Sequence, residues 1–195
     1  MPNLIKEVAN SFDIHDTRPI KLWTEDEARF GRMGNPRKCW APKKVRPIVH
    51  LQRIREYLYV FSAVCPWSGE TYSLILPLCN TIAMRVFLEG FSQVYHDYRN
   101  IIIVDRATWH VTKRLPLFDN IRFIYLPAGS PELNPTEHLW DHIREKYLGN
   151  KTFDSLDEMQ DEMVDILQKF ETERATIKKL TEFYWMTENS LLMAD

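Results

Sequence analysis

Alternating and continuous apolar runs predict the strands of this chain. Residues 19–30 (PIKLWTEDEARF) begin as an alternating apolar strand and then meet three successive acids. The runs at 57–64 and 71–77 are typical of two strands, and the Pro- and Gly-containing connection between them favours a β-hairpin. The continuous run 101–104 (IIIV) indicates a strand buried on both faces. A fifth strand is expected at 121–126.

Apolar residues at helical spacing predict helices between and after these strands. Asn80 is a good cap for a helix that runs to about residue 95. Asn134, followed by a proline, can begin another helix. Two more helices are expected at 155–170 and at about 171–184. This order of elements predicts an α/β fold in which helices cover a mixed sheet.

The size of the chain is suited to a single domain. At 195 residues and 45% hydrophobic residues, the chain can bury one good core. We expect the main domain at 19–150, an opening segment of unassigned structure at 1–18, and C-terminal helices packed on the same domain at 151–195.

Three cysteines without C-x-x-C spacing indicate reduced thiols. No signal peptide and no membrane-length apolar run is found, so we expect a cytoplasmic protein without a membrane partner.

Charge is distributed unevenly, although the formal net charge is only -2. Residues 29–55 contain nine Lys or Arg and no acid, whereas residues 154–195 contain eleven acids and four bases. The basic stretch favours a polyanion such as DNA or RNA as partner, and the alternative is an ordinary charged surface. Trp40 within it is expected to anchor its loop, with stacking on a base as the other possibility.

Acidic residues from three separate parts of the chain are placed so that their carboxylates could form a metal site. Asp105 ends the buried strand, and an acid there needs a partner, water or a cation. Glu137 lies in the first turn of a later helix, where the chain can return to that strand end. A third acid can come from residues 25–27, where alternation points Asp26 away from its two neighbours. The sequence alone does not say which of these directions faces inward.

Each acid also has a simpler interpretation. Asp105 can begin a turn after its strand, and residues 25–27 can form a turn after a short strand. Glu137 comes three residues after Asn134 and can be its partner in a capping box.

Four motifs occur in order along the chain: WTEDEARFG at 23–31, WAPKKVRP at 40–47, VDRATWH at 104–110 and SPELNPTEHLW at 130–140. Together they resemble the catalytic domain of mariner-superfamily DDE transposases, most closely a bacterial insertion-sequence branch. The resemblance covers about residues 21–150. It implies a ribonuclease-H-like mixed sheet flanked by helices, with extra C-terminal helices. It also implies metal-dependent phosphodiester cleavage and strand transfer at transposon ends.

The resemblance assigns a catalytic and metal-binding triad to Asp26, Asp105 and Glu137. Two Mg²⁺ (or Mn²⁺) ions are the implied cofactors, because hard cations take carboxylate ligands and a pair can clamp the attacking and leaving oxygens. Arg106 and Gly129 depart from the family pattern of a small residue or Asn, and of Tyr, at these positions. The Arg106 guanidinium can pair with Asp105 and compete with metal, or hold a phosphate.

The expected partners are transposon-end and target DNA, with a homodimer on the DNA. Only about twenty residues precede the first motif, so we expect end recognition by a separately encoded helix-turn-helix protein, or a truncated chain. The alternatives are a non-catalytic DNA-binding remnant and a generic ribonuclease-H-like nuclease. For Trp109, packing in the core is an equally good alternative to a DNA contact. The expected set of DNA contacts is Arg29, Lys43, Lys44, Arg46, Arg106, Trp109 and His110.

Overall fold

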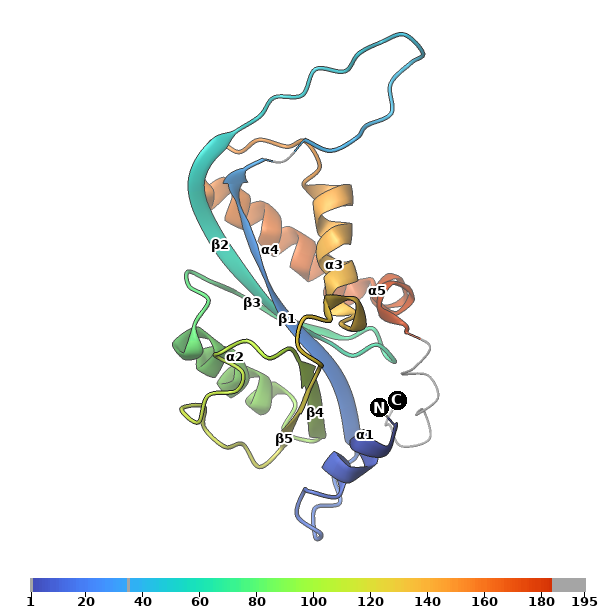
Figure 1. The fold of residues 1–195 in the computed structure, drawn as a ribbon, viewed down its shortest axis with the longest axis vertical. Helices are drawn as coiled ribbons and strands as arrows, with labels where there is room; N and C mark the ends of the chain where they lie inside the picture. Colours follow the sequence, from blue (N-terminus) through green and yellow to red (C-terminus); the bar gives the residue numbers. More distant parts are fainter. Residues whose placement is uncertain (1, 35, 184–195) are drawn as a thin grey trace.

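A mixed sheet forms the centre of the computed structural model, which describes residues 2–34 and 36–183 (Figure 1). Within these ranges the sheet has five strands in the order β3-β2-β1-β4-β5. β1 pairs antiparallel with β2 and parallel with β4, so the predicted mixed sheet is confirmed. The strands are β1 (Ile20–Met33), β2 (Arg53–Val64), β3 (Thr71–Leu76), β4 (Arg99–Val104) and β5 (Ile121–Tyr125).

Helices cover both faces of the sheet: α2 lies on one face, and α3, α4 and α5 lie on the other (Figure 1). The opening segment, left unassigned from sequence, contains α1, which buries Ile5 beside the sheet. A short π-helix, Ile143–Tyr147, continues α3. The α-helices are α1 (Pro2–Ala9), α2 (Thr81–Val94), α3 (Thr136–His142), α4 (Leu156–Thr172) and α5 (Arg174–Thr181). No described helix combines the length and apolar character that a membrane crossing requires.

Local signals explain where these helices begin. The Asn80 side chain accepts hydrogen bonds from the backbone N–H groups of Ile82 and Ala83, as expected for a cap. Ser155 likewise accepts from Glu158 and begins α4, close to the predicted helix. The helix predicted at 171–184 is shorter, because Glu173 ends α4 and α5 covers only Arg174–Thr181. The last residue of that predicted helix, Tyr184, lies outside the described residues.

Side chains of β1 alternate between the two faces of the sheet. Trp23 packs with α2, and its ring centroid lies 5.1 Å from that of Phe91. Ala28 and Phe30 pack on the other face with the residues of α3 and α4. The same alternation turns Asp26 toward α3, and Glu25 and Glu27 toward the layer that contains α2.

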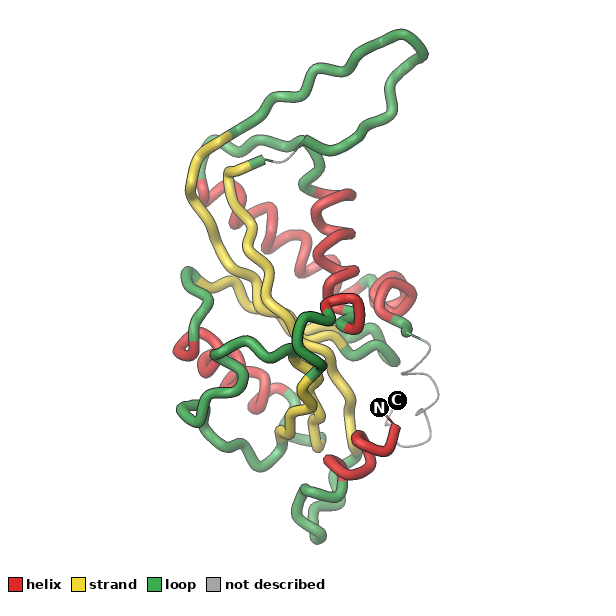
Figure 2. Tube along the Cα trace, viewed as in Figure 1, coloured by secondary structure: helices red, strands yellow, loops and turns green. Residues whose placement is uncertain are grey.

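β1 and β2 continue beyond the rest of the sheet as a two-stranded ribbon that ends in a long loop at 36–52 (Figures 1 and 2). β1 is continuous through residues 25–27, so the interpretation of these acids as a turn is wrong. Trp40 in the loop is fully exposed, which also makes the anchoring prediction wrong. The chain therefore presents its basic stretch on an extended hairpin.

Candidate active site

Strand register brings two of the predicted carboxylates together. The parallel pairing of β1 with β4 reaches Thr24 and Ile103. Asp26 and Asp105 each lie two residues farther on, where β4 leaves the sheet. Because paired positions advance together along parallel strands, these two acids meet at the carboxyl end of β4.

Two buried polar contacts attach the start of α3 to β1. The Asn134 side-chain amide donates to the carbonyl of Glu25 at 3.0 Å, and the hydroxyls of Thr24 and Thr136 lie 2.9 Å apart. All of these groups are buried, so their hydrogen bonds strongly favour this one placement of the helix. The first turn of α3 therefore carries Glu137 to the ends of β1 and β4.

The turn before α3 has its own hydrogen bonds. The Asn134 side chain accepts from the N–H of Thr136 at 3.1 Å, which supplies the capping contact expected from the sequence. The backbone N–H of Asn134 donates to the carbonyl of Pro131 at 2.9 Å. Since the reciprocal capping-box bond would need this same N–H, the capping box is not what determines the position of Glu137.

Asp26, Asp105 and Glu137 all line one cavity of about 270 Å³. The rest of its wall comes from Arg106 and Ala107, from the loop at 126–131, and from Asn134. Gly129 in that loop has φ +71°, and the space beside its Cα is open. The three acids implied by the family resemblance thus come from three different elements and face the same space.

Burial, followed by the charge of Glu137, raises the pKa of Asp26 to about 7. The indole N–H of buried Trp140 opposes this rise by donating to Asp26 Oδ2 at 2.8 Å. A carboxylate with a raised pKa beside a second acid is a site where a cation would relieve repulsion.

The other two acids differ in their surroundings. Asp105 is half-exposed, and a hydrogen bond from His110 is the main reason that its pKa lies below the usual range. Its Oδ1 accepts from the backbone N–H of Ala107 at 2.8 Å and contacts His110 Nδ1 at 2.7 Å. Burial raises the pKa of Glu137, and the nearby Arg144 opposes this rise. Asp105 is thus held through one oxygen.

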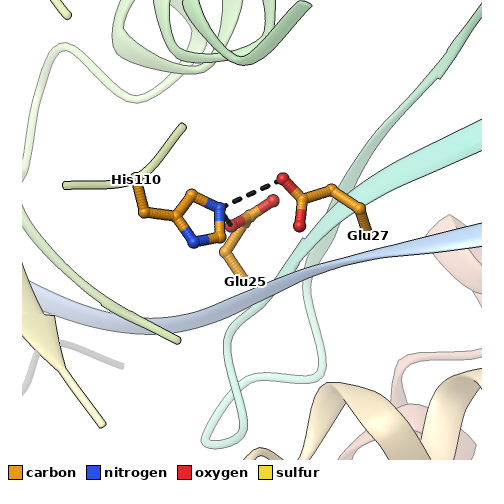
Figure 3. Close-up of side chains that lie close together, drawn as sticks. All are labelled: Glu25, Glu27 and His110. Carbon is orange, nitrogen blue, oxygen red and sulfur yellow. Dashed lines mark hydrogen bonds and ion pairs between the residues drawn. The ribbon is translucent and has the colours of Figure 1, made fainter. Parts of the chain in front are cut away.

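A second acidic group lies on the opposite face of β1. Figure 3 shows the imidazole of His110 directed toward the carboxylates of Glu25 and Glu27. His110 Nε2 lies 3.0 Å from Glu27 Oε1 and 3.3 Å from Glu25 Oε2. Burial alone would lower the pKa of His110, but its contacts with three carboxylates outweigh burial and raise it. Burial and the charge of Glu27 raise the pKa of Glu25 to about 8.

Sequence reasoning missed this group, although strand alternation already placed both glutamates on one face. The expectation that His110 contacts DNA is wrong, because its side chain is completely buried. Trp109 packs in part against the α2 layer, and its indole N–H donates to Glu27 at 2.6 Å. Packing therefore accounts for Trp109, and its DNA contact stays a prediction.

The remaining expected DNA contacts are exposed cations. The Arg29 guanidinium lies 4.5 Å from the centre of the Tyr57 ring, and Lys43, Lys44 and Arg46 lie in the loop at 36–52. The Nε of Arg106 donates to the carbonyl of Leu126 at 3.1 Å. No ion pair joins Arg106 to Asp105 in the described ranges, so the guanidinium does not occupy that carboxylate.

A family model described as DDE superfamily endonuclease matches residues 21–160, which is most of the chain. The chain belongs to this family of DDE endonucleases. It is 40% identical over 104 residues to the uncharacterized protein y4pE/y4sA of Sinorhizobium fredii (strain NBRC 101917 / NGR234), covering 53% of this chain and 77% of that protein. The DDE superfamily predicted from the motifs is thereby confirmed.

Solved structures similar to this DDE endonuclease confirm the fold. The pre-cleavage Mos1 transpososome matches with a TM-score of 0.62 and 12% identity over 99% of this chain and 60% of that one. The Mos1 mariner paired-end complex with Mn matches with a TM-score of 0.61 and 14% identity, covering 97% of this chain and 60% of that one. The chain thus spans about three-fifths of the Mos1 chains and has their ribonuclease-H-like fold.

Proposed function

We propose that this chain is the catalytic domain of a DNA transposase that cleaves phosphodiester bonds at transposon ends and transfers the freed strand. The observation that carries the proposal is the meeting of Asp26, Asp105 and Glu137 in one cavity of a DDE endonuclease. Each acid belongs to a different element, so their meeting is a property of the fold. Family, fold and carboxylate arrangement all support the same chemistry.

The cavity fits Mg²⁺ or Mn²⁺, and we propose two ions. Its acidic donors are all carboxylate oxygens, which hard cations prefer. Asp105 Oδ1 is already occupied by Ala107 and His110, which leaves Oδ2 as the oxygen for a cation. When bound, the ions would activate the attacking water or 3′-hydroxyl and stabilise the leaving oxygen. We therefore assign Asp26, Asp105 and Glu137 as the metal ligands, because all three carboxylates line the same cavity.

The surrounding residues hold these carboxylates in place. Trp140 restrains Asp26 through its indole N–H, and His110 restrains Asp105 through Nδ1. The buried pair Thr24 and Thr136 keeps α3, and with it Glu137, against β1. Preorganised ligands of this kind reduce the reorganisation that metal and substrate binding would otherwise require.

DNA is the proposed partner, and the basic hairpin is its proposed contact surface. A cavity of about 160 Å³ at the base of the hairpin is lined by cations from both β1 and the segment after α3, including Arg29, Arg32 and Arg144. Exposed cations along the loop at 36–52 extend this surface. Phosphate contacts of this type position DNA without reading its sequence. A homodimer and a separate helix-turn-helix protein remain parts of the proposal.

Nicking of supercoiled plasmid with Mn²⁺ tests the proposal. The wild type and Glu132→Gln, an exposed acid of the same segment, should nick, whereas Glu137→Gln should not. Absence of nicking in all three, with DNA binding intact, would instead favour a non-catalytic DNA-binding remnant. Products in which a labelled 3′ end is joined to target DNA would separate a transposase from a nuclease that only cuts.

A further inference from the structure

The acidic group on the far face of β1 contains a carboxylate that accepts no hydrogen bond within the described residues. The Glu25 side chain is 0% exposed, and neither of its oxygens has a hydrogen-bond partner among those residues. Its Oε2 points at His110 Nε2, and Glu27 Oε1 approaches the same nitrogen (Figure 3). Because a buried carboxylate that accepts no hydrogen bond is costly, its position beside a single imidazole needs a physical explanation.

We propose that Glu25, Glu27 and His110 form a second divalent-cation site for a first-row transition ion such as Zn²⁺ or Mn²⁺. One ligand atom from each residue lies within 4.8 Å of the other two. Two ligand atoms that are each about 2.0–2.1 Å from Zn²⁺ at a tetrahedral angle lie roughly 3.3 Å apart. The distances from His110 Nε2 to Glu27 Oε1, 3.0 Å, and to Glu25 Oε2, 3.3 Å, are close to this value.

Neighbouring side chains hold His110 and Glu27 in place, as such side chains do around the ligands of known metal sites. Asp105 Oδ1 lies 2.7 Å from His110 Nδ1, so Nδ1 can keep its proton, and a cation would replace the proton of Nε2 between the two glutamates. A carboxylate that orients a histidine in this way is the usual support behind a metal-bound imidazole. Trp109 donates to Glu27 Oε1 at 2.6 Å and orients that ligand too. An imidazole among the donors favours a transition ion over Mg²⁺.

This site is distinct from the cavity of the proposed active site. Glu25 and Glu27 face the α2 layer, whereas Asp26 between them contacts Trp140 of α3 on the opposite face. Asp105 connects the two places, since its Oδ1 contacts His110 while its other oxygen remains for the cavity. An ion on Nε2 would therefore hold the His110 ring, and through it Asp105, in one orientation. The site itself does not depend on the proposed DNA cleavage.

Pulsed electron paramagnetic resonance of the full chain, stripped with chelator and loaded with MnCl₂ alone, tests the proposal. The proposed active site offers only oxygen ligands, so imidazole-nitrogen modulation of the Mn²⁺ signal that the wild type shows and Glu25→Gln loses at the same Mn²⁺ concentration would come from His110. We expect this modulation in the wild type and in Asp26→Asn, the matched control one residue away on the other face. Glu25→Gln should bind this ion at least about tenfold more weakly. One equivalent of Zn²⁺ should remove the modulation by displacing Mn²⁺.

Two results would overturn the proposal. One is wild-type protein that shows no nitrogen modulation at saturating Mn²⁺, a measurement that needs no variant. The other is Glu25→Gln protein that binds the ion with unchanged affinity. Thermal denaturation with chelator checks the fold of Glu25→Gln, which should remain folded because an amide of the same size replaces a buried carboxyl group whose oxygens accept no hydrogen bond. Plasmid nicking reports the other site, so failure of either proposal is recognised separately.

Discussion

Replacing Asp26 by Asn should stabilise the metal-free protein at alkaline pH. The folded protein keeps the proton of Asp26 up to a pKa of about 7, whereas the ordinary value is 3.8. Between these values the unfolded chain binds fewer protons than the folded protein, so the free energy of unfolding falls as the pH rises. Above pH 7 this loss is complete. Asn carries no charge, and its side-chain oxygen can still accept from Trp140.

The pKa difference sets the size of the effect. A pKa about three pH units above its ordinary value lowers the free energy of unfolding by about 4 kcal/mol once Asp26 is fully ionised. Water reaching the cavity from solvent reduces this figure, so we expect Asp26→Asn to gain roughly 2–4 kcal/mol over the wild type at pH 8. At pH 4 the two proteins should differ little, since Asp26 is then protonated in the folded protein.

Urea denaturation in chelator at pH 4 and pH 8 measures both free energies of unfolding. Asp141→Asn removes an acid whose side chain is 67% exposed on the same helix as Glu137 and should give a much smaller change. Added Mg²⁺ should stabilise the wild type at pH 8 but leave Asp26→Asn nearly unchanged. The reasoning is refuted if the gain of Asp26→Asn over the wild type is the same at both pH values.

Three further changes test other parts of the structure. Thr136→Val should cost about 1–3 kcal/mol in urea denaturation by leaving the Thr24 hydroxyl buried without its partner, and the double Val variant should lose less than the summed single variants. Gly69→Ala should cost about 1–3 kcal/mol in thermal denaturation, because φ is +69° and the new Cβ would meet the Arg174 carbonyl; an unchanged Tm would contradict this. Arg106→Gly should reduce the salt dependence of DNA binding by about one phosphate contact in fluorescence anisotropy, and an unchanged slope would exclude that contact.

Most of the fold follows from local patterns. Period-two and period-3.6 spacing of apolar residues, with caps at Asn80 and Asn134, located the main strands and helices. Such signals depend on neighbours along the chain, and so they can be read without the structure. The family motifs added the expected triad, and its three members do line one cavity. Their role as metal ligands stays a prediction until nicking is measured.

Contacts between distant segments decided what local patterns left open. Trp40 is a large apolar side chain that would normally be buried and hold its loop in place. Its loop extends away from the hydrophobic core, and the side chain is exposed. His110 follows Asp105 closely and was expected at the DNA surface, but the segment after β4 folds back and buries its ring against acids of β1. Burial depends on which elements pack together, and sequence spacing does not carry that information.

The acids at 25–27 show this division most clearly. Strand alternation is a property of the backbone, so the sequence alone determined that Asp26 must point away from Glu25 and Glu27. Which face held the proposed active site depended on where α3 docks, and that was decided by buried contacts made across more than 100 residues, such as Thr24 with Thr136. Local geometry therefore separated the three carboxylates, and tertiary packing assigned one to the cavity and two to the buried histidine.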